Sequence, residues 1–87
     1  MALISVFYGI LIYLYKEGNR HGKPHVHAMY NEYKMSIAAD GEILAGELPP
    51  KQQRIVEAWV SVHETDIIAS WDALNKFNEV IKIKGWE

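Results

Sequence analysis

The feature that most constrains the fold is a change of hydrophobic period at Leu48-Pro49-Pro50. Before it, apolar and polar residues alternate over several short runs, which is typical of half-buried strands. After it, apolar residues recur three and four positions apart, which is typical of amphipathic helices. The chain therefore predicts an α+β fold, with a sheet over about residues 1–48, a helical part over about 49–79 and an extended tail over 80–87.

The N-terminal part predicts an antiparallel meander of four to five strands. Residues 2–15 are rich in β-branched and aromatic side chains, and Gly9 indicates a bend that divides this run. The dipeptide Asp40-Gly41 is a strong hairpin signal. Further strands are expected at residues 25–30, at 33–38 and at about 42–45.

Two helices are expected to pack on one face of this sheet. The first starts near Pro50, because proline lacks the N–H that would have no partner in a first helical turn. The second is expected to have Thr65 or Asp66 as its N-cap. The predicted inward stripes are Ile55, Trp59 and Val62 beside Val56, Val60 and His63 in the first helix, and Ile67, Ile68, Trp71 and Leu74, extended by Phe77, in the second.

Composition indicates one domain of 87 residues with an ample core, since 49% of its residues are hydrophobic and it has three tryptophans and five tyrosines. The apolar run 2–15 is shorter than the ~20 residues of a spanning helix, and no basic residue precedes it, so no membrane segment is expected. The chain has no cysteine, which fits a reducing cytoplasm and leaves any metal to histidine and oxygen ligands.

A formal charge of −2 argues against nucleic-acid binding by bulk electrostatics. A local basic patch remains in the loop before the third expected strand. Arg20 and Lys23 are the candidate phosphate contacts there, with Lys16 nearby and Glu17 opposing them. A solvated turn explains the same residues equally well.

Chemistry is concentrated in the stretch 21–27, which holds three of the four histidines. His25 and His27 are two residues apart, so in a strand their imidazoles lie on one face while Val26 and Ala28 lie on the other. Two imidazoles at this spacing can chelate one metal ion, and zinc is the candidate metal, although the spacing alone leaves the cofactor open. The candidates for a third ligand are His63, His21, Glu64 and Asp66.

Proton transfer is the other chemistry open to these histidines. An unperturbed imidazole has a pKa of about 6.5, so a pair can divide acid and base roles near neutral pH, as cleavage of RNA without metal requires. A structural role on a wet sheet face is a third interpretation. If the helices cover the face of Val26 and Ala28, His63 lies on the opposite side of the sheet from His25 and His27.

Several segments, in a fixed order, carry a resemblance to a known family. They are Ile4-Ser5-Val6-Phe7-Tyr8-Gly9-Ile10, Pro24-His25-Val26-His27-Ala28 with Tyr30 and Tyr33, Gly41-Glu42-Ile43-Leu44 with Gly46-Glu47-Leu48-Pro49, and Trp59, His63 and Trp71. With these segments the chain resembles the small bacterial proteins called domain of unknown function 4160. The resemblance covers almost the whole chain, but Lys23 stands where that family typically has a second proline, and Glu64 where a basic residue often follows the helical histidine.

The resemblance implies a gene arrangement rather than a known biochemical activity. The family is uncharacterised, and its genes are associated with those of another uncharacterised family, domain of unknown function 2442, in an arrangement proposed to be a toxin and antitoxin pair. By that analogy the chain is the toxin-like member, with a small antitoxin-like partner and an RNA-directed activity. His25, His27 and His63 fall on positions of the family pattern.

The leading hypothesis is therefore a toxin-like protein that acts on RNA, with His25 and His27 as acid-base or phosphate-contacting groups and His63 assisting. A metal-binding domain that uses the same three histidines is one alternative. Another is a non-catalytic domain that binds a partner, or a second copy of itself, through an exposed sheet edge. Whether the chain is an enzyme stays open at this point.

Overall fold

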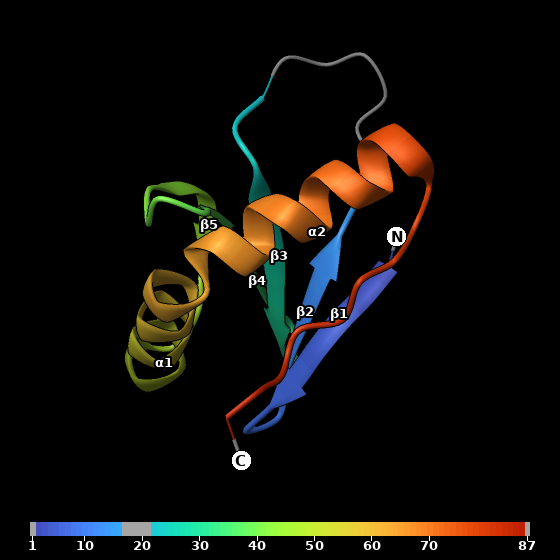
Figure 1. Cartoon of the computed structure of the whole chain (residues 1–87). Helices are drawn as coiled ribbons and strands as arrows, with labels where there is room; N and C mark the ends of the chain where they lie inside the picture. Colours follow the sequence, from blue (N-terminus) through green and yellow to red (C-terminus); the bar gives the residue numbers. More distant parts are fainter. Residues whose placement is uncertain (1, 17–21, 87) are drawn as a thin grey trace.

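The computed structural model describes residues 2–16 and 22–86, and it confirms the α+β fold (Figure 1). The described residues form one antiparallel sheet in the order β1-β2-β3-β4-β5, followed by two helices. The strands are β1 (Ala2–Phe7), β2 (Ile10–Leu14), β3 (His25–Tyr30), β4 (Tyr33–Ala38) and β5 (Ile43–Glu47), and the helices are α1 (Pro50–Val62) and α2 (Glu64–Phe77).

The hairpin turns explain why the N-terminal run is two strands. Tyr8 and Gly9 have φ angles of 50° and 75°, and Phe7 pairs with Ile10 across them. Positive φ at both central residues matches the twist of a two-residue hairpin. The bend predicted at Gly9 is therefore a tight turn. Asn31 also has a positive φ, in the turn that joins β3 to β4.

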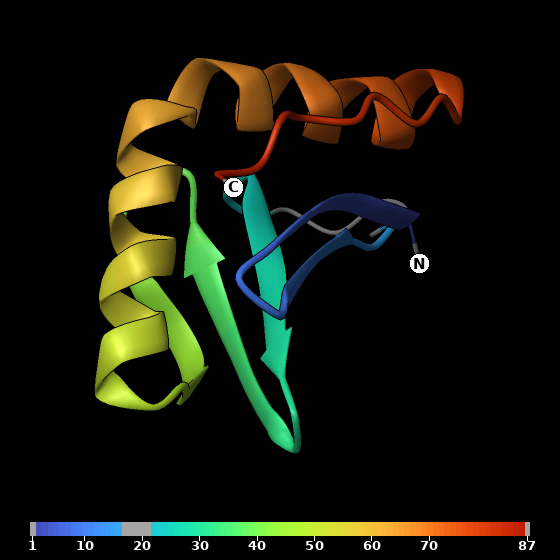
Figure 2. The same cartoon turned by 90° about the horizontal axis from the view of Figure 1, so that it is seen from below.

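The helices cover one face of the sheet, and the core lies between these two layers (Figure 2). Val26 and Ala28 of β3 are fully buried on this face. The ring of Trp59 in α1 belongs to the same core and lies 5.1 Å from the ring of Phe7, measured between centroids. The remaining core residues include Ile10, Ile12, Met35, Ile37, Val56, Val60 and Ile67.

The helix boundaries and faces differ in part from the prediction. His63 ends α1 and directly precedes α2, so the second helix starts at Glu64 rather than after a Thr65 or Asp66 cap. Val62 is 68% exposed and Phe77 70% exposed, because each occupies the last turn of its helix, beyond the part that packs on the sheet. Ile68 is also exposed, whereas its neighbour Ile67 carries the inward contact.

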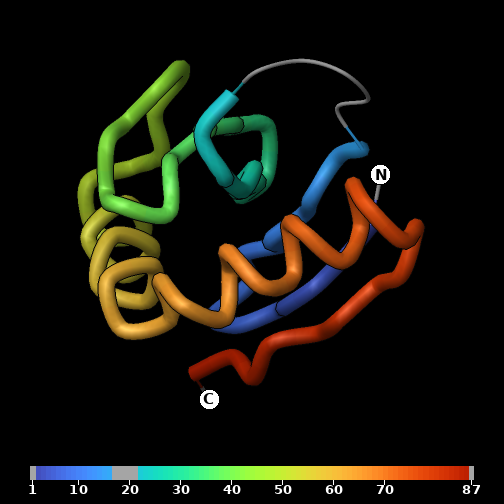
Figure 3. The backbone as a smooth tube through the Cα atoms, turned by 45° about the horizontal axis from the view of Figure 1, so that its top comes forward, coloured from blue at the N-terminus to red at the C-terminus, as the bar shows by residue number. Residues whose placement is uncertain are grey.

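The C-terminal segment runs alongside β1 (Figure 3). Asn78 ends α2 in the left-handed conformation, which reverses the chain. The backbone N–H of Ile83 then donates to the carbonyl of Ile4 at 2.8 Å. The hydroxyl of Ser70 donates to the Ile81 carbonyl at 2.7 Å. These bonds hold an extended segment against the outer edge of the sheet. No helix of the described residues is long and apolar enough to cross a membrane.

Candidate functional site

The imidazoles of His25 and His27 lie side by side on the sheet face that the helices leave open. Along β3, Val26 and Ala28 are buried whereas His25 and His27 are partly exposed, which is the alternation of a half-buried strand. The two ring centroids lie 5.1 Å apart, with the ring planes inclined at 65°. The structure thus brings the predicted pair together.

A backbone contact fixes the orientation and tautomer of His25. Its Nδ1 lies 2.7 Å from the carbonyl oxygen of Lys23. A carbonyl oxygen only accepts hydrogen bonds, so Nδ1 carries the proton and donates it. In the neutral ring the lone pair therefore resides on Nε2. This is the arrangement of a general base or a metal ligand whose other nitrogen is held by the protein.

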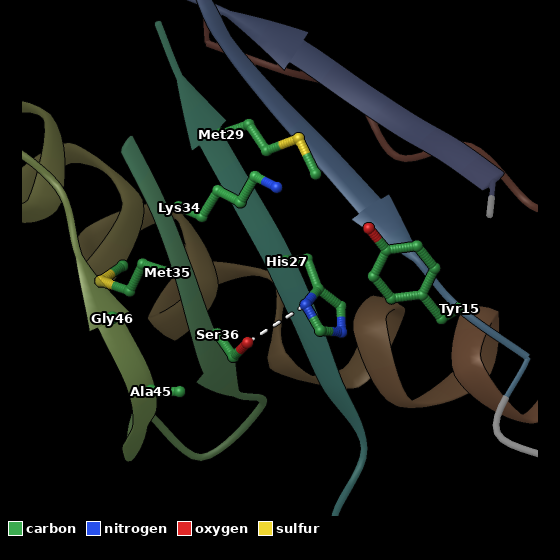
Figure 4. A pocket seen from close by; sticks show the side chains of 8 residues that line it. All are labelled: Tyr15, His27, Met29, Lys34, Met35, Ser36, Ala45 and Gly46. Atoms are coloured by element: carbon green, nitrogen blue, oxygen red, sulfur yellow. Dashed lines mark hydrogen bonds between the residues drawn. The ribbon is translucent and has the colours of Figure 1, made fainter. Parts of the chain in front are cut away.

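His27 is held by two side chains from the neighbouring strands (Figure 4). Its Nδ1 lies 3.1 Å from the hydroxyl oxygen of Ser36 in β4. The ring of Tyr15, which follows β2, lies 4.2 Å from the imidazole between centroids and at 62° to it. This T-shaped contact is a favourable arrangement of two aromatic rings, and it helps to fix the orientation of the imidazole.

A shallow pocket of about 200 Å³ opens beside His27. Figure 4 shows Lys34 extending across the sheet in the direction of Met29, so that its ammonium group lies over β3. This cation was missed by the sequence analysis, as were Tyr15 and Ser36. The lining residues are Tyr15, His27, Met29, Lys34, Met35, Ser36, Ala45 and Gly46.

Lys23 is engaged in ion pairs. Its Nζ lies 2.8 Å from Asp40 and 2.5 Å from Glu42, in the β4–β5 connection. The hydrogen bonds to Asp40 and Glu42 raise the pKa of Lys23, and the hydrogen bond from Lys23 lowers the pKa of the Asp40 carboxyl. Two carboxylates thus offset one ammonium, so the prediction that Lys23 contacts phosphate loses its support. Its carbonyl instead positions His25.

This cluster predicts a pH-dependent effect of Asp40→Asn on stability. The folded-state pKa of Asp40 is depressed below its ordinary value near 3.8, so its contribution is present above that value and is lost as the pH falls through the folded pKa. In urea unfolding, Asp40→Asn is expected to lower the midpoint at pH 7, and the difference from the parent chain should shrink below about pH 4.

The matched control is Asp72→Asn. Asp72 faces Lys76 across an exposed gap of 3.9 Å, and pairs of that kind contribute little. A midpoint difference for Asp40→Asn that is the same at pH 2.5 and pH 7 would show that the carboxylate charge has no part in the effect.

His63 lies in a different environment, at the junction of the two helices. Its Nδ1 is 3.3 Å from an oxygen of Asp66, and its ring is 5.0 Å from that of Trp59. Because Trp59 packs on the buried face of the sheet, His63 lies on the helical side and the pair His25 and His27 on the other. The sheet separates the three histidines that the sequence analysis grouped.

A three-ligand metal site does not form within the described residues, where no three histidine or acidic side chains are placed to hold an ion. Asp66, a candidate third ligand, pairs with His63 instead of approaching β3, and Glu64 begins α2 beside it. His21 and Arg20, the remaining candidates from the loop, lie outside the described residues. The chemistry of the site therefore rests on two imidazoles and their immediate neighbours.

The chain is therefore an α+β protein. Its antiparallel five-stranded sheet carries two helices on one face and a histidine pair on the other. The family described as "Domain of unknown function (DUF4160)" matches residues 9–72, from the β1–β2 turn into α2. The chain belongs to this family, as the resemblance indicated. Searches of curated proteins and of solved structures gave no match.

Proposed function

We propose that this chain is the toxin-like component of a two-gene toxin–antitoxin module, and that it cleaves RNA on the open face of its sheet. The observation that carries the proposal is the pair of imidazoles of His25 and His27, with centroids 5.1 Å apart. Cleavage of RNA without metal needs one general base and one general acid, and two adjacent imidazoles supply both. The two-gene setting is taken from the family resemblance.

In the proposed reaction His25 is the base. Its Nε2 accepts the proton of a ribose 2′-hydroxyl, since Nδ1 is held as a donor by the Lys23 carbonyl. The 2′-oxygen attacks the adjacent phosphorus, and the bond between phosphorus and the 5′-oxygen breaks. His27 donates its proton to that leaving oxygen, for which its ring must turn outward from Tyr15, because its Nε2 is buried in the structure. The products are a 2′,3′-cyclic phosphate and a free 5′-hydroxyl, and solvent restores the two protonation states.

The surroundings of His27 support its assignment as the acid. The ring of Tyr15 packs edge-on against the imidazole, and the hydroxyl of Ser36 can accept the Nδ1 proton that the charged form carries. Lys34, which lines the same pocket, is the cation available to the phosphate in place of Lys23. Each role thus belongs to a side chain of the open face.

The test is the chemistry of the products. The purified chain is incubated with an end-labelled single-stranded RNA in the presence of EDTA, both alone and in a translation extract. We expect 2′,3′-cyclic phosphate ends, and no cleavage of the same RNA with 2′-O-methyl groups, because the nucleophile is then blocked. Cleavage that depends on added metal would contradict the proposal, as would intact RNA in both settings.

A second function, the docking of a partner protein, is favoured by the exposure of β5. All five residues of this strand are exposed, including the apolar Ile43 and Leu44. In the described sheet β5 pairs only with β4, so its outer edge is open to strand addition. This edge suits an extended segment of the small antitoxin-like partner, whether or not the histidines are catalytic.

The substitution Leu44→Glu tests this docking. Leu44 is 43% exposed, so the change should alter the free energy of unfolding by no more than about 0.5 kcal/mol. Co-expressed with the product of the neighbouring gene, the parent chain should co-purify with it and the variant should not. Val62→Glu is the matched control, since Val62 is an exposed apolar residue of α1 and not of β5. Equal recovery of the partner with Leu44→Glu would exclude the β5 edge as its dock.

A further inference from the structure

A second pocket, of about 600 Å³, lies where the β1–β2 turn, the end of β3, the start of α1 and the C-terminal segment meet. Figure 1 shows these elements converging at its lower left, where the C-terminal segment reaches the turn beside α1. We call it the aromatic pocket. Its lining residues are Tyr8, Tyr30, Lys51, Gln52, Ile55 and Trp86.

The aromatic pocket is separate from the histidine site. The two pockets share no lining residue. Tyr30 lies an even number of positions from Val26 and Ala28, so it belongs to the face of β3 that the helices cover. A role for this pocket therefore does not depend on the proposed RNA cleavage.

Backbone contacts of the preceding residues fix Trp86 in the lining of the aromatic pocket. A Cβ atom at Gly85 would lie 2.7 Å from the carbonyl oxygen of Val6 and 2.9 Å from the Phe7 ring, so only glycine lets the segment approach β1 this closely. The indole N–H of Trp59 donates to the Lys84 carbonyl at 3.2 Å. With the two preceding residues, Lys84 and Gly85, held in this way, Trp86 packs against the core and lines the pocket.

Tyr8 reaches the pocket from a backbone conformation that a tyrosine seldom adopts. Its φ is 50° and its side chain is 55% exposed. Asparagine and glycine are the residues that usually occupy this position of a tight hairpin. A bulky residue that is strained and exposed indicates that its side chain has a use beyond folding.

The side chains that line the aromatic pocket indicate which class of ligand it can bind. Tyr8, Tyr30 and Trp86 offer flat π-surfaces, on which planar rings stack. Lys51 supplies a positive charge and Gln52 an amide that can pair with a ring edge. None of the described lining residues is acidic, which argues against an organic cation and favours a planar ring that carries a negative charge.

We propose that the aromatic pocket binds one nucleotide unit, with its base stacked on Tyr8 and Trp86 and its phosphate at Lys51. The unit is either a free mononucleotide or one residue of an RNA strand. Gln52 contacts the edge of the base. The volume of the pocket is within the range of small-molecule sites, which is about 300–1,000 Å³.

The test is an NMR titration that follows the indole N–H signals of the ¹⁵N-labelled chain. Adenosine monophosphate, adenosine and a four-residue RNA are added in turn. We expect saturable shifts of the Trp86 signal, and weaker binding of adenosine than of the monophosphate. Tighter binding of the tetranucleotide identifies an RNA strand as the source of the unit, and equal binding identifies a free nucleotide.

Two variants make the test specific. Tyr8→Asn removes the ring while relieving the backbone strain, so it should keep the fold and weaken binding roughly tenfold. Lys51→Gln should remove the advantage of the monophosphate over adenosine. The matched controls are Phe77→Ala and Lys76→Gln, which alter an aromatic and a lysine at the far end of α2 and should change nothing.

The proposal is overturned if Trp86 gives no saturable shift with any of the three ligands. It is equally overturned if Tyr8→Asn binds as tightly as the parent chain, or if a proline-rich peptide shifts Trp86 and the nucleotides cannot displace it.

Discussion

Replacing His25 and His27 together with asparagine is expected to abolish RNA cleavage and the growth inhibition that follows from it. Each asparagine retains a donor near the position of Nδ1, so the contacts to the Lys23 carbonyl and the Ser36 hydroxyl can persist without a titrating ring. Loss of a general acid or base typically lowers the rate about 10²–10⁴-fold. The double variant should be only slightly slower than either single variant, because the two groups act as a unit.

The single variants should separate the two roles by their pH profiles. The parent chain is expected to give a bell-shaped profile, since the base must be neutral and the acid protonated. His25→Asn should remove the dependence on the acidic side, and His27→Asn the dependence on the alkaline side. If His25→Asn instead removed the alkaline dependence and His27→Asn the acidic one, His27 would be the base and His25 the acid, and the site would be the same.

His63→Asn is the matched control for this series. His63 lies at the helix junction with Asp66 and Trp59, on the opposite side of the sheet from the pair. We expect its replacement to leave the cleavage rate and its pH profile unchanged. Full activity in the His25 and His27 double variant, or an equal loss with His63→Asn, would contradict the proposed mechanism.

Trp59→Ala is expected to give the largest loss of stability, about 3–5 kcal/mol in the free energy of unfolding. The side chain of Trp59 is fully buried and its ring packs on Phe7 at 5.1 Å between centroids. Its indole N–H also holds the C-terminal segment through the Lys84 carbonyl. The substitution therefore opens a cavity between the sheet and the helices, and it releases the segment that carries Trp86.

Urea unfolding followed by far-ultraviolet circular dichroism measures this loss. Trp59→Phe keeps an aromatic ring but removes the N–H, so its cost should be smaller than that of Trp59→Ala. Phe77→Ala, at a position 70% exposed, should change the free energy of unfolding by less than about 0.5 kcal/mol. A loss below about 1 kcal/mol for Trp59→Ala would mean that the core is not organised around this ring.

Most of the fold could be predicted because its signals are local. The change of period at Leu48-Pro49-Pro50 separates strands from helices, and the turn at Gly9 divides the first run. What failed was the predicted burial of the helix ends. Val62 and Phe77 fit the apolar stripe, but their exposure depends on how far the sheet extends beneath each helix, and the local sequence does not encode that extent.

The candidate site was predictable only in part, because some of its contacts depend on tertiary structure and not on local spacing. The spacing of His25 and His27 placed both rings on one face, and the structure brings them together. The two-residue turn between β3 and β4 also pairs His27 with Ser36, a neighbour that a register argument could have found. Tyr15 joins the site because β2 lies next to β3, and Lys34 because its long side chain reaches across the sheet. The spacing of the histidines in the sequence predicts neither.

Whether His63 lies near His25 and His27 depends on which face of the sheet the helices cover. The burial of Val26 and Ala28 answers this question, and it separates His63 from His25 and His27. Lys23 illustrates another limit. Its positive charge suggested a phosphate contact, but the carboxylates of Asp40 and Glu42, distant in sequence, lie against it.

The measurement that tests the account most directly is an NMR pH titration of the imidazole nitrogens, with and without a short RNA made non-cleavable by 2′-deoxy substitution at the target residue. We predict that the signals of His25 and His27 shift together on binding RNA, with one dissociation constant, while those of His63 do not respond. Signals of His25 and His27 that do not respond to RNA would contradict the account, as would a shift of His63 together with theirs.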